Sequence, residues 1–231
     1  MFLYPDHAKF DRILPKNKIY GNVQISRALR QRFVNEIEEI VWLYTLGTKT
    51  IRLPTAHGVA EIQIFQIALK TGDLREDVLR TIDRAIPSLL FFELTFQNQT
   101  RFAAAYKRLS EGSSSQPVLG DFYFQTPWFP ASTPRQPMPV ALDMESLYAQ
   151  MLRQHMLASS FALRSRPDEA LADTVERGSR IRATRRECQR LEAKLKKEMQ
   201  FNRKVEINTE LRRCRAELAN LESAKDLSAQ S

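Results

Sequence analysis

Three carboxylates in the first part of the chain are of the type that metal-dependent cleavage of phosphodiesters uses, and a glutamine stands beside one of them. Glu61 and Gln63 stand two residues apart in "EIQIFQIALK", and Glu36 and Glu39 precede them in "NEIEEI". In that chemistry two carboxylates hold Mg²⁺ while a lysine helps to position the attacking water. Here Gln63 stands where the lysine would be needed, so the set of catalytic groups is incomplete.

The order of elements around these residues resembles the core of the PD-(D/E)xK nucleases. Between residues 26 and 96 the pattern predicts helix, strand, strand, helix, strand. That fold needs an Asp on its second strand and Glu-x-Lys on its third, but "TIRLPTAHG" contains no Asp. An active nuclease that uses Glu61 with Glu36 or Glu39 therefore stays an alternative, and an inactive relative of the fold is favoured over it.

The histidines and cysteines do not form a metal-binding pattern. His7, His57 and His155 are scattered, with no carboxylate or Cys at ligand spacing, and we expect them to face solvent. Cys188 and Cys214 also lack a second Cys or a His at ligand spacing, so we expect small buried side chains and neither zinc nor a disulfide. The seven glycines are spread singly, which argues against a phosphate-binding loop. We predict no metal and no cofactor.

The composition predicts a soluble protein of the cytoplasm. The 231 residues are 43% hydrophobic and 27% charged. No apolar run approaches the roughly 18–20 residues that a membrane helix needs, so we expect no membrane partner. The opening "MFLYPDHAKF" lacks a basic stretch followed by an apolar one, and we expect no secretion signal. The length suits one ordinary domain with an appendage.

The elements that must position the carboxylates alternate between helix and strand. A helix should begin at Ser26, whose side chain can cap free amides. Its apolar residues at helical spacing are Leu29, Phe33, Ile37 and Ile40. "IVWLYTL" favours a strand, "TKTIRLP" a short extended segment, and residues 60–69 another strand. "DLREDVLRTIDRAI" predicts a helix after an Asp cap, ending before Pro87.

The middle of the chain predicts an antiparallel part of the sheet. "SLLFFELTF", "RFAAAYKRL" and "DFYFQTPWF" are three strands separated by hairpin-like polar segments. A helix is expected over residues 143–157, after an extended proline-rich segment, and an irregular basic segment at the start of the chain. The fold class is therefore α+β, a mixed sheet with flanking helices, followed by a basic helical hairpin or coiled coil. The predicted parts are an α+β domain (1–160), a linker (161–172), a coiled-coil helical hairpin (173–224) and a disordered tail (225–231).

A basic tract dominates the tail. The whole chain has a formal charge of +8, but residues 177–215 alone hold 14 Lys and Arg against 5 Asp and Glu. Clustered cations bind phosphates by releasing counterions, although a solvated coiled coil has a similar composition. The candidate residues for binding nucleic acid or a partner are Arg180, Arg182, Arg185, Arg186, Arg190, Lys196, Lys197, Arg203 and Lys204. Lys107 and Arg108, at a predicted strand end, could also hold a phosphate or simply end a solvated strand.

The tail carries two apolar seams at coiled-coil spacing. The first contains Ile181, Cys188, Leu191 and Leu195, and the second contains Leu211, Cys214, Leu218 and Leu221. Their phases differ, which a stutter within one long helix would absorb. Apolar residues also mirror each other about Arg203, and this favours an antiparallel hairpin that turns at residues 202–204 with Phe201 and Val205 closing its end.

Several segments in order resemble an uncharacterised bacterial family, domain of unknown function 4391. They are "LPKNKIY", "IEEIVWLYTLGTKTIRLP", "EIQIFQIALK", "AIPSLLFFELTF", "AAYKR" and "KKEMQFNRKVEIN". The resemblance covers nearly the whole chain and implies no established activity or catalytic residue. It implies a neighbourhood of helicases and DNA methyltransferases in restriction or phage-defence systems, an association that supplies no mechanism.

Three functions follow as hypotheses. The favoured one is a non-enzymatic accessory protein that docks on a helicase or DNA methyltransferase, with a basic helical arm that contacts the partner or DNA. The alternatives are the metal-dependent nuclease and a structural protein that forms homodimers through the tail. The positions of the carboxylates distinguish the nuclease from the other two hypotheses. A basic arm that binds a partner or DNA also requires cations in the tail that form no internal ion pair.

Overall fold

The computed structural model describes residues 2–108 and 118–223. The chain forms two compact units, Met1–Ala162 and Leu163–Ser231. The expected disordered tail at 225–231, and most of the polar segment expected between the second and third hairpin strands, lie outside the described residues. In the part that the structure describes, no helix is both long and apolar enough to cross a membrane.

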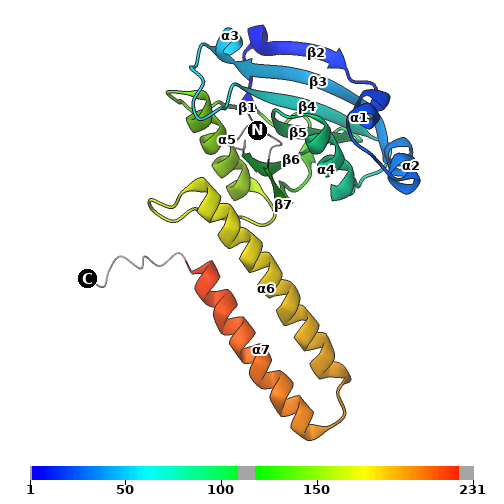
Figure 1. Ribbon diagram of the computed structural model, residues 1–231, viewed down its shortest axis with the longest axis vertical. Coiled ribbons are helices and arrows are strands. Elements are labelled where there is room, and N and C mark those ends of the chain that lie inside the picture. The colour runs from blue at the N-terminus through cyan, green and yellow to red at the C-terminus, as the bar shows by residue number, and fades with distance from the viewer. Residues whose placement is uncertain (1, 109–117, 224–231) are drawn as a thin grey trace. The chain divides into compact units, whose positions relative to one another are not determined.

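A mixed seven-stranded sheet forms the centre of the first unit, within the described residues (Figure 1). The strands are β2 (Lys9–Ile13), β3 (Ile37–Gly47), β4 (Glu61–Leu69), β5 (Leu89–Phe96), β6 (Gln99–Arg108), β7 (Val118–Gln125) and β8 (Phe129–Pro130). Their order is β2-β3-β4-β5-β6-β7, with β8 on β6. The β4–β5 pair is parallel and the other pairs are antiparallel, as the expected hairpins require. The α+β prediction is confirmed.

Helices cover both faces of this sheet. They are α1 (Lys16–Asn22), α2 (Arg27–Glu36), the short α3 (Thr48–Ile51), α4 (Glu76–Ala85) and α5 (Met144–Ala158), with a 3₁₀ turn η1 (Asp6–Ala8). Residues of α1, α2 and α4 share one apolar cluster with β4 and β5. On the other face α5 lies against β4, β6 and β7, and Phe91 packs edge-on against Tyr148. A small parallel sheet pairs β1 (Phe2–Leu3) with β9 (Gln136–Pro137).

Burial on both faces explains why β4 and β5 alternate imperfectly. Phe65 and Phe92 point into the cluster shared with α1, α2 and α4, and both are almost fully buried. Ile64 and Phe91, one position earlier on each strand, are also buried. A strand covered on both sides is a near-continuous apolar run and does not alternate strictly with polar residues.

The first predicted helix is shorter than expected. Ser26 caps α2 by accepting a hydrogen bond from the amide of Leu29 at 3.2 Å, as predicted. The helix ends at Glu36, however, and both Ile37 and Ile40 belong to β3, where they pair with β4. Ile37 and Ile40 fit the helical spacing, but both are β-branched and form part of strand β3. The sheet is favoured there because pairing with β4 buries both side chains.

Three local predictions are wrong. "TKTIRLP" forms the short helix α3, which ends with Arg52 in the left-handed region (φ 57°), and is not extended. Helix α4 begins after Arg75 without a side-chain cap, and not after an Asp. The start of the chain is not irregular, because it contains β1, η1, β2 and α1. In each case packing on the sheet decides a segment whose local sequence is ambiguous.

Lys107 is buried inside the first unit and does not face a phosphate. Its ammonium group donates to three backbone carbonyls, those of Asp83 (2.7 Å), Ile86 (2.5 Å) and Ser88 (2.8 Å). The side chain is 2% exposed and also lies 3.5 Å from the Asp83 carboxylate. Three donors of one ammonium thereby satisfy carbonyls at and just beyond the end of α4, which a helix end otherwise leaves free. The prediction that Lys107 binds a phosphate is wrong.

Burial shifts the ionisation of both Lys107 and Asp83, and each charge opposes the shift of the other. Burial raises the pKa of Asp83 to about 6, while the positive charge of Lys107 opposes the rise. Burial lowers the pKa of Lys107 itself, and Asp83 opposes that shift. Tyr123 donates a hydrogen bond to Asp83 in the same buried cluster. The Lys107–Asp83 pair therefore has a structural role, since neither group reaches solvent.

We predict that Lys107→Met lowers the free energy of unfolding by about 3 kcal/mol or more, because three carbonyls and a buried carboxylate lose their partner. Arg108→Met is the matched control, since Arg108 is the exposed next residue on the same strand. Chemical denaturation of the full chain measures both. If the two variants had the same free energy of unfolding, the Lys107 ammonium would not stabilise the fold.

Candidate nucleic-acid interface

The second unit is an antiparallel helical hairpin. Helices α6 (Leu171–Lys197) and α7 (Phe201–Glu222) lie side by side along most of their length (Figure 1). The predicted hairpin is confirmed, and a single long helix is ruled out by extended backbone at Glu198 and Gln200. Both predicted seams face each other, with Leu191, Leu211 and Ile207 buried between the helices.

The cysteines are joined across the seam. Cys188 and Cys214 are buried as expected, but they form a disulfide, with Cα atoms 5.9 Å apart. The prediction of two unlinked side chains is wrong, because only the folded-back hairpin brings these positions, 26 residues apart in sequence, to the same height. The link fixes the register of α6 against α7.

The turn lies earlier than the mirror relation placed it. Cys188 faces Cys214, so the axis of the hairpin is near Phe201 and not Arg203. Glu198 closes the turn by accepting hydrogen bonds from the amides of Met199 (2.9 Å) and Gln200 (3.0 Å). The residues expected at the turn, 202–204, instead form the first turn of α7. The placement was wrong by one helical turn because apolar residues recur at similar distances about either axis.

An ionic cluster holds the open end of the hairpin. Arg177 donates from two nitrogens to the carboxylate of Glu169, each at 2.8 Å, and also to the carbonyl of Leu221 at 3.4 Å. Arg166 donates to the carbonyl of Ser223 at 3.1 Å. These guanidinium groups satisfy carbonyls at the C-terminal end of α7. The hydrogen bonds from Arg177 lower the pKa of Glu169 to about 2.

The predicted basic residues of the tail divide into two groups. Several are occupied within the hairpin: Arg185 pairs with Glu222, and Arg190 pairs with Glu187. Arg186 bonds the carbonyl of Arg182, which is itself half-buried. The exposed cations Arg180, Lys196, Lys197, Arg203 and Lys204 form no ion pair among the described residues. Arg108 is exposed on the other unit.

Most of the free cations gather where the hairpin turns. Sequence reasoning missed Lys194, which is exposed and also has no ion pair in the described part of the chain. Five cations thus lie within residues 194–206 against two carboxylates, Glu198 and Glu206. We call the following residues the turn patch: Lys194, Lys196, Lys197, Arg203 and Lys204, with the apolar Met199, Phe201 and Val205 between them.

The apolar residues of the turn patch are exposed. Met199 is 89% exposed, Phe201 is 77% exposed and Val205 is 50% exposed. The prediction that Phe201 and Val205 close the end of the hairpin is therefore wrong, because the shifted turn moves them out of the seam. A ring and a thioether held among free lysines and arginines can contact the apolar faces of bases while the cations contact phosphates.

The four candidate catalytic residues do not converge. Glu39 pairs with Ala68 near one end of β4, whereas Glu61 begins the strand at the other end. Seven strand positions separate the two levels, which corresponds to roughly 23 Å. Glu36 lies at the same end as Glu39, where it accepts a hydrogen bond from the amide of Arg75. The metal site that a nuclease would need from Glu61 with Glu36 or Glu39 is not formed.

Glu61 and Gln63 instead form a small closed network. Gln63 donates to Glu61 at 2.5 Å, and the hydroxyl of Ser88 donates to the same carboxylate oxygen at 2.6 Å. Gln63 also donates to Ser88 at 3.0 Å. The amide that replaces the lysine of the nuclease pattern is therefore a structural partner of the carboxylate. The network ties the start of β4 to the residue before β5.

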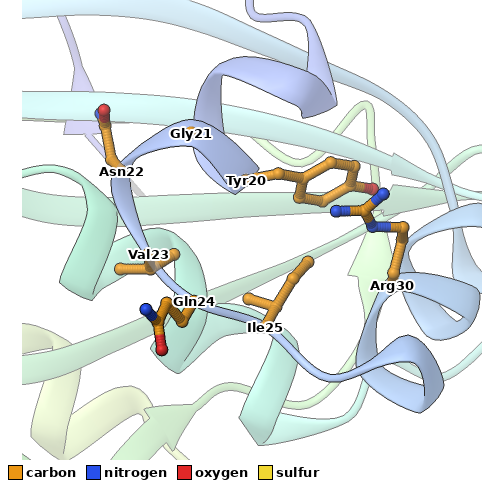
Figure 2. Close-up of a pocket in the computed structure, with 7 residues that line it drawn as sticks. All are labelled: Tyr20, Gly21, Asn22, Val23, Gln24, Ile25 and Arg30. Carbon is orange, nitrogen blue, oxygen red and sulfur yellow. The ribbon is translucent and has the colours of Figure 1, made fainter.

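A metal centre in the first unit would need a cluster of ligands, and a catalytic pair would need a nucleophile beside its base. Among the described residues, no group of three or more His, Cys, Asp or Glu is placed to hold a metal. A shallow pocket of about 480 Å³ lies at the α1–α2 connection, lined by residues 20–25 and Arg30. Figure 2 shows the Arg30 guanidinium next to the ring of Tyr20, whose centre lies 5.1 Å from it. None of these residues is a nucleophile paired with a base.

Only part of the expectation for the histidines holds. His7 and His57 are exposed, and His57 contacts Glu145 at 2.5 Å. His155 is 8% exposed, on the face of α5 that packs against the sheet. Its position among buried apolar residues of α5 was a usable signal, since it lies four residues after Met151 on the same face.

These features define a class of protein: an α+β domain on a mixed sheet, followed along the chain by a basic antiparallel helical hairpin. The family described as "Domain of unknown function (DUF4391)" matches residues 2–218. The chain belongs to this family. Comparison with curated proteins and with solved structures gives no match.

We predict that Glu169→Gln weakens the hairpin by about 2 kcal/mol at neutral pH, because the charge-assisted bonds to Arg177 are lost. In the wild type, a folded pKa near 2 lies below the ordinary 4.5, so this stability is present above pH 4.5 and is lost as the pH falls toward 2. Hydrogen exchange of α6 and α7 amides in the full chain measures it. Glu217→Gln, a change at an exposed position, is the control. If Glu169→Gln kept the pH dependence of the wild type, the pairing of Glu169 with Arg177 would not be its source.

Proposed function

We propose that this protein is a non-enzymatic accessory protein that binds nucleic acid through the turn patch. The observation that carries the proposal is the gathering of five exposed, unpaired cations around exposed Met199 and Phe201 at the turn of a rigid hairpin. Free lysines and arginines gain affinity for phosphates by displacing counterions. Cations already paired within a protein gain less, since a partner must first be displaced.

The construction of the hairpin supports this role. The disulfide, the buried seam and the Glu169–Arg177 cluster hold the two helices together without using the turn patch. A rigid support lowers the entropy lost on binding, since the backbone that carries the cations and the ring is already held in place. The turn patch is therefore positioned by the parts of the hairpin that the binding does not consume.

The cellular setting of the proposal comes from the family resemblance. The resemblance supports a setting beside helicases and DNA methyltransferases of bacterial restriction or phage-defence systems, and we propose that the protein acts with them on DNA in the cytoplasm. We propose that one of these enzymes is the protein partner. The nuclease alternative loses support, because its carboxylates lie at opposite ends of β4.

We predict that the full chain binds a short DNA duplex at low salt, and that a quadruple variant with Lys196, Lys197, Arg203 and Lys204 changed to Gln binds far more weakly. If each cation contacts one phosphate, the slope of log affinity against log salt becomes shallower by about 3–4. Fluorescence anisotropy over a salt series measures both effects.

The matched control changes four exposed cations of the first unit, Arg27, Lys18, Lys49 and Arg84, to Gln. This variant has the same net charge as the first one, so it separates a local contact from the charge of the whole chain. Equal loss of binding in both variants would reject the turn patch as the binding surface. Unchanged binding in the first variant would do the same.

We predict that Phe201→Ala lowers affinity for single-stranded DNA by about 1–3 kcal/mol with little change in the salt slope, because a stacking contact is lost and no phosphate contact is. The ring is 77% exposed, so the fold should be unaffected. Val140→Ala, which alters another exposed apolar side chain, is the control. A partner protein, not DNA, is the target if Phe201→Ala leaves DNA binding intact but prevents co-purification of a helicase or methyltransferase.

A further inference from the structure

A second cavity lies within the first unit, apart from the shallow pocket at the α1–α2 connection. It has a volume of about 380 Å³, within the range of small-molecule sites. Its walls are mainly aromatic: Phe2, Tyr4, Phe91, Phe102, Trp128 and Phe129. Phe102 and Phe129 are stacked, with ring centres 5.5 Å apart and planes at 17°. Such walls favour a flat ring that can stack against them.

The cavity favours an uncharged ligand. Its lining contains no Lys, Arg, Asp or Glu. The nearby carboxylate of Glu93 is already satisfied, because Arg135 donates to both of its oxygens at 2.9 Å. Neither charge is left to attract a phosphate or a cation. A ligand would gain affinity from stacking and from a few hydrogen bonds.

His155 supplies a buried hydrogen-bond acceptor in the wall of this cavity. The Nε2 atom of His155 donates to the carbonyl of Phe124 at 2.7 Å, and a carbonyl can only accept, so the proton is on Nε2. Burial lowers the pKa of His155 to about 4, and the ring is therefore neutral at pH 7. The other nitrogen, Nδ1, has a lone pair and no hydrogen-bond partner among the described residues.

A donor lies close by. The hydroxyl of Thr126 accepts a hydrogen bond from the amide of Phe102 at 3.0 Å, and its own proton has no acceptor in the described part of the chain. Thr126 is 6% exposed and lines the same cavity. It follows Phe124, whose carbonyl accepts from His155, by two residues along the chain. The acceptor on His155 and the donor on Thr126 thus line the same cavity.

We propose that this cavity binds a nucleobase, with an amino group donating to Nδ1 of His155 and a ring nitrogen accepting from Thr126. The aromatic walls stack on the faces of the base. The absence of charged residues from the lining leaves any phosphate outside. The base belongs either to a free nucleoside or to an unpaired nucleotide of a strand, and both present the same edge. This site does not depend on the turn patch.

Titration of the full chain with adenosine tests the proposal, and Trp128 in the wall makes quenching of fluorescence a direct signal. We expect saturable binding of adenosine. Purine riboside, which lacks the amino group, should bind about tenfold more weakly, because one hydrogen bond to His155 is lost. A single-stranded oligonucleotide with adenine bases is the second probe and shows whether the base enters as part of a strand.

Two variants decide where the ligand binds. Ala158→Leu fills the cavity from an exposed position and removes no native hydrogen bond, so it should abolish adenosine binding with a normal thermal unfolding curve. Ser160→Leu, a nearby exposed change outside the lining, should bind as the wild type does. The proposal is overturned if neither adenosine nor the oligonucleotide binds. It is also overturned if adenosine binding survives Ala158→Leu, or if purine riboside binds with the same affinity as adenosine.

Discussion

One buried ammonium group links the elements on which the first unit depends. Lys107 of β6 bonds carbonyls at the end of α4 and before β5, and its amide donates to the hydroxyl of Tyr148 on α5 at 2.9 Å. Asp83, next to it, accepts from Tyr123 of β7. The crossover from β4 to β5 through α4 must end where β5 can pair in parallel with β4, and this ammonium satisfies the carbonyls at that point. A helix end buried without such a partner would be costly.

The hairpin buries far fewer apolar side chains than the first unit does. Its seam buries a narrow row of small and branched side chains, and a disulfide and an ionic cluster supplement it. Several cations along the paired helices form ion pairs with carboxylates on the same or the facing helix, as Arg215 does with Glu192. At the turn the facing helix ends and the seam runs out. The lysines and arginines there form no ion pair among the described residues, although the charges of Arg203 and Lys194 act on Glu198, and the apolar residues are exposed. The surface that we propose for nucleic acid therefore lies at that end.

The carboxylates show that candidate catalytic residues that suit one reaction by type can lie far apart in the folded chain. Glu61 and Gln63 do lie together, but they bond each other and Ser88. Glu39 lies in strand β3 and Glu36 is the last residue of the helix before it. Because β3 runs antiparallel to β4, both residues lie at the far end of the pair from Glu61. The order of elements constrains which strands are neighbours. It does not place two given side chains at the same level, because that depends on strand length and register.

The sequence by itself determined most of the alternation of helix and strand, the antiparallel strands β5 to β7, the cap at Ser26 and the two seams of the tail. Each follows from a local signal: the spacing of apolar residues, polar segments between strands, or a hydroxyl before a helix. Only the tertiary structure decided the end of α2, the turn of the hairpin, the pairing of Cys188 with Cys214 and the burial of Lys107 and His155. Those outcomes depend on partners distant along the chain. A lysine or histidine has the same sequence signal whether it meets water or three carbonyls, and only the packed neighbours make the difference.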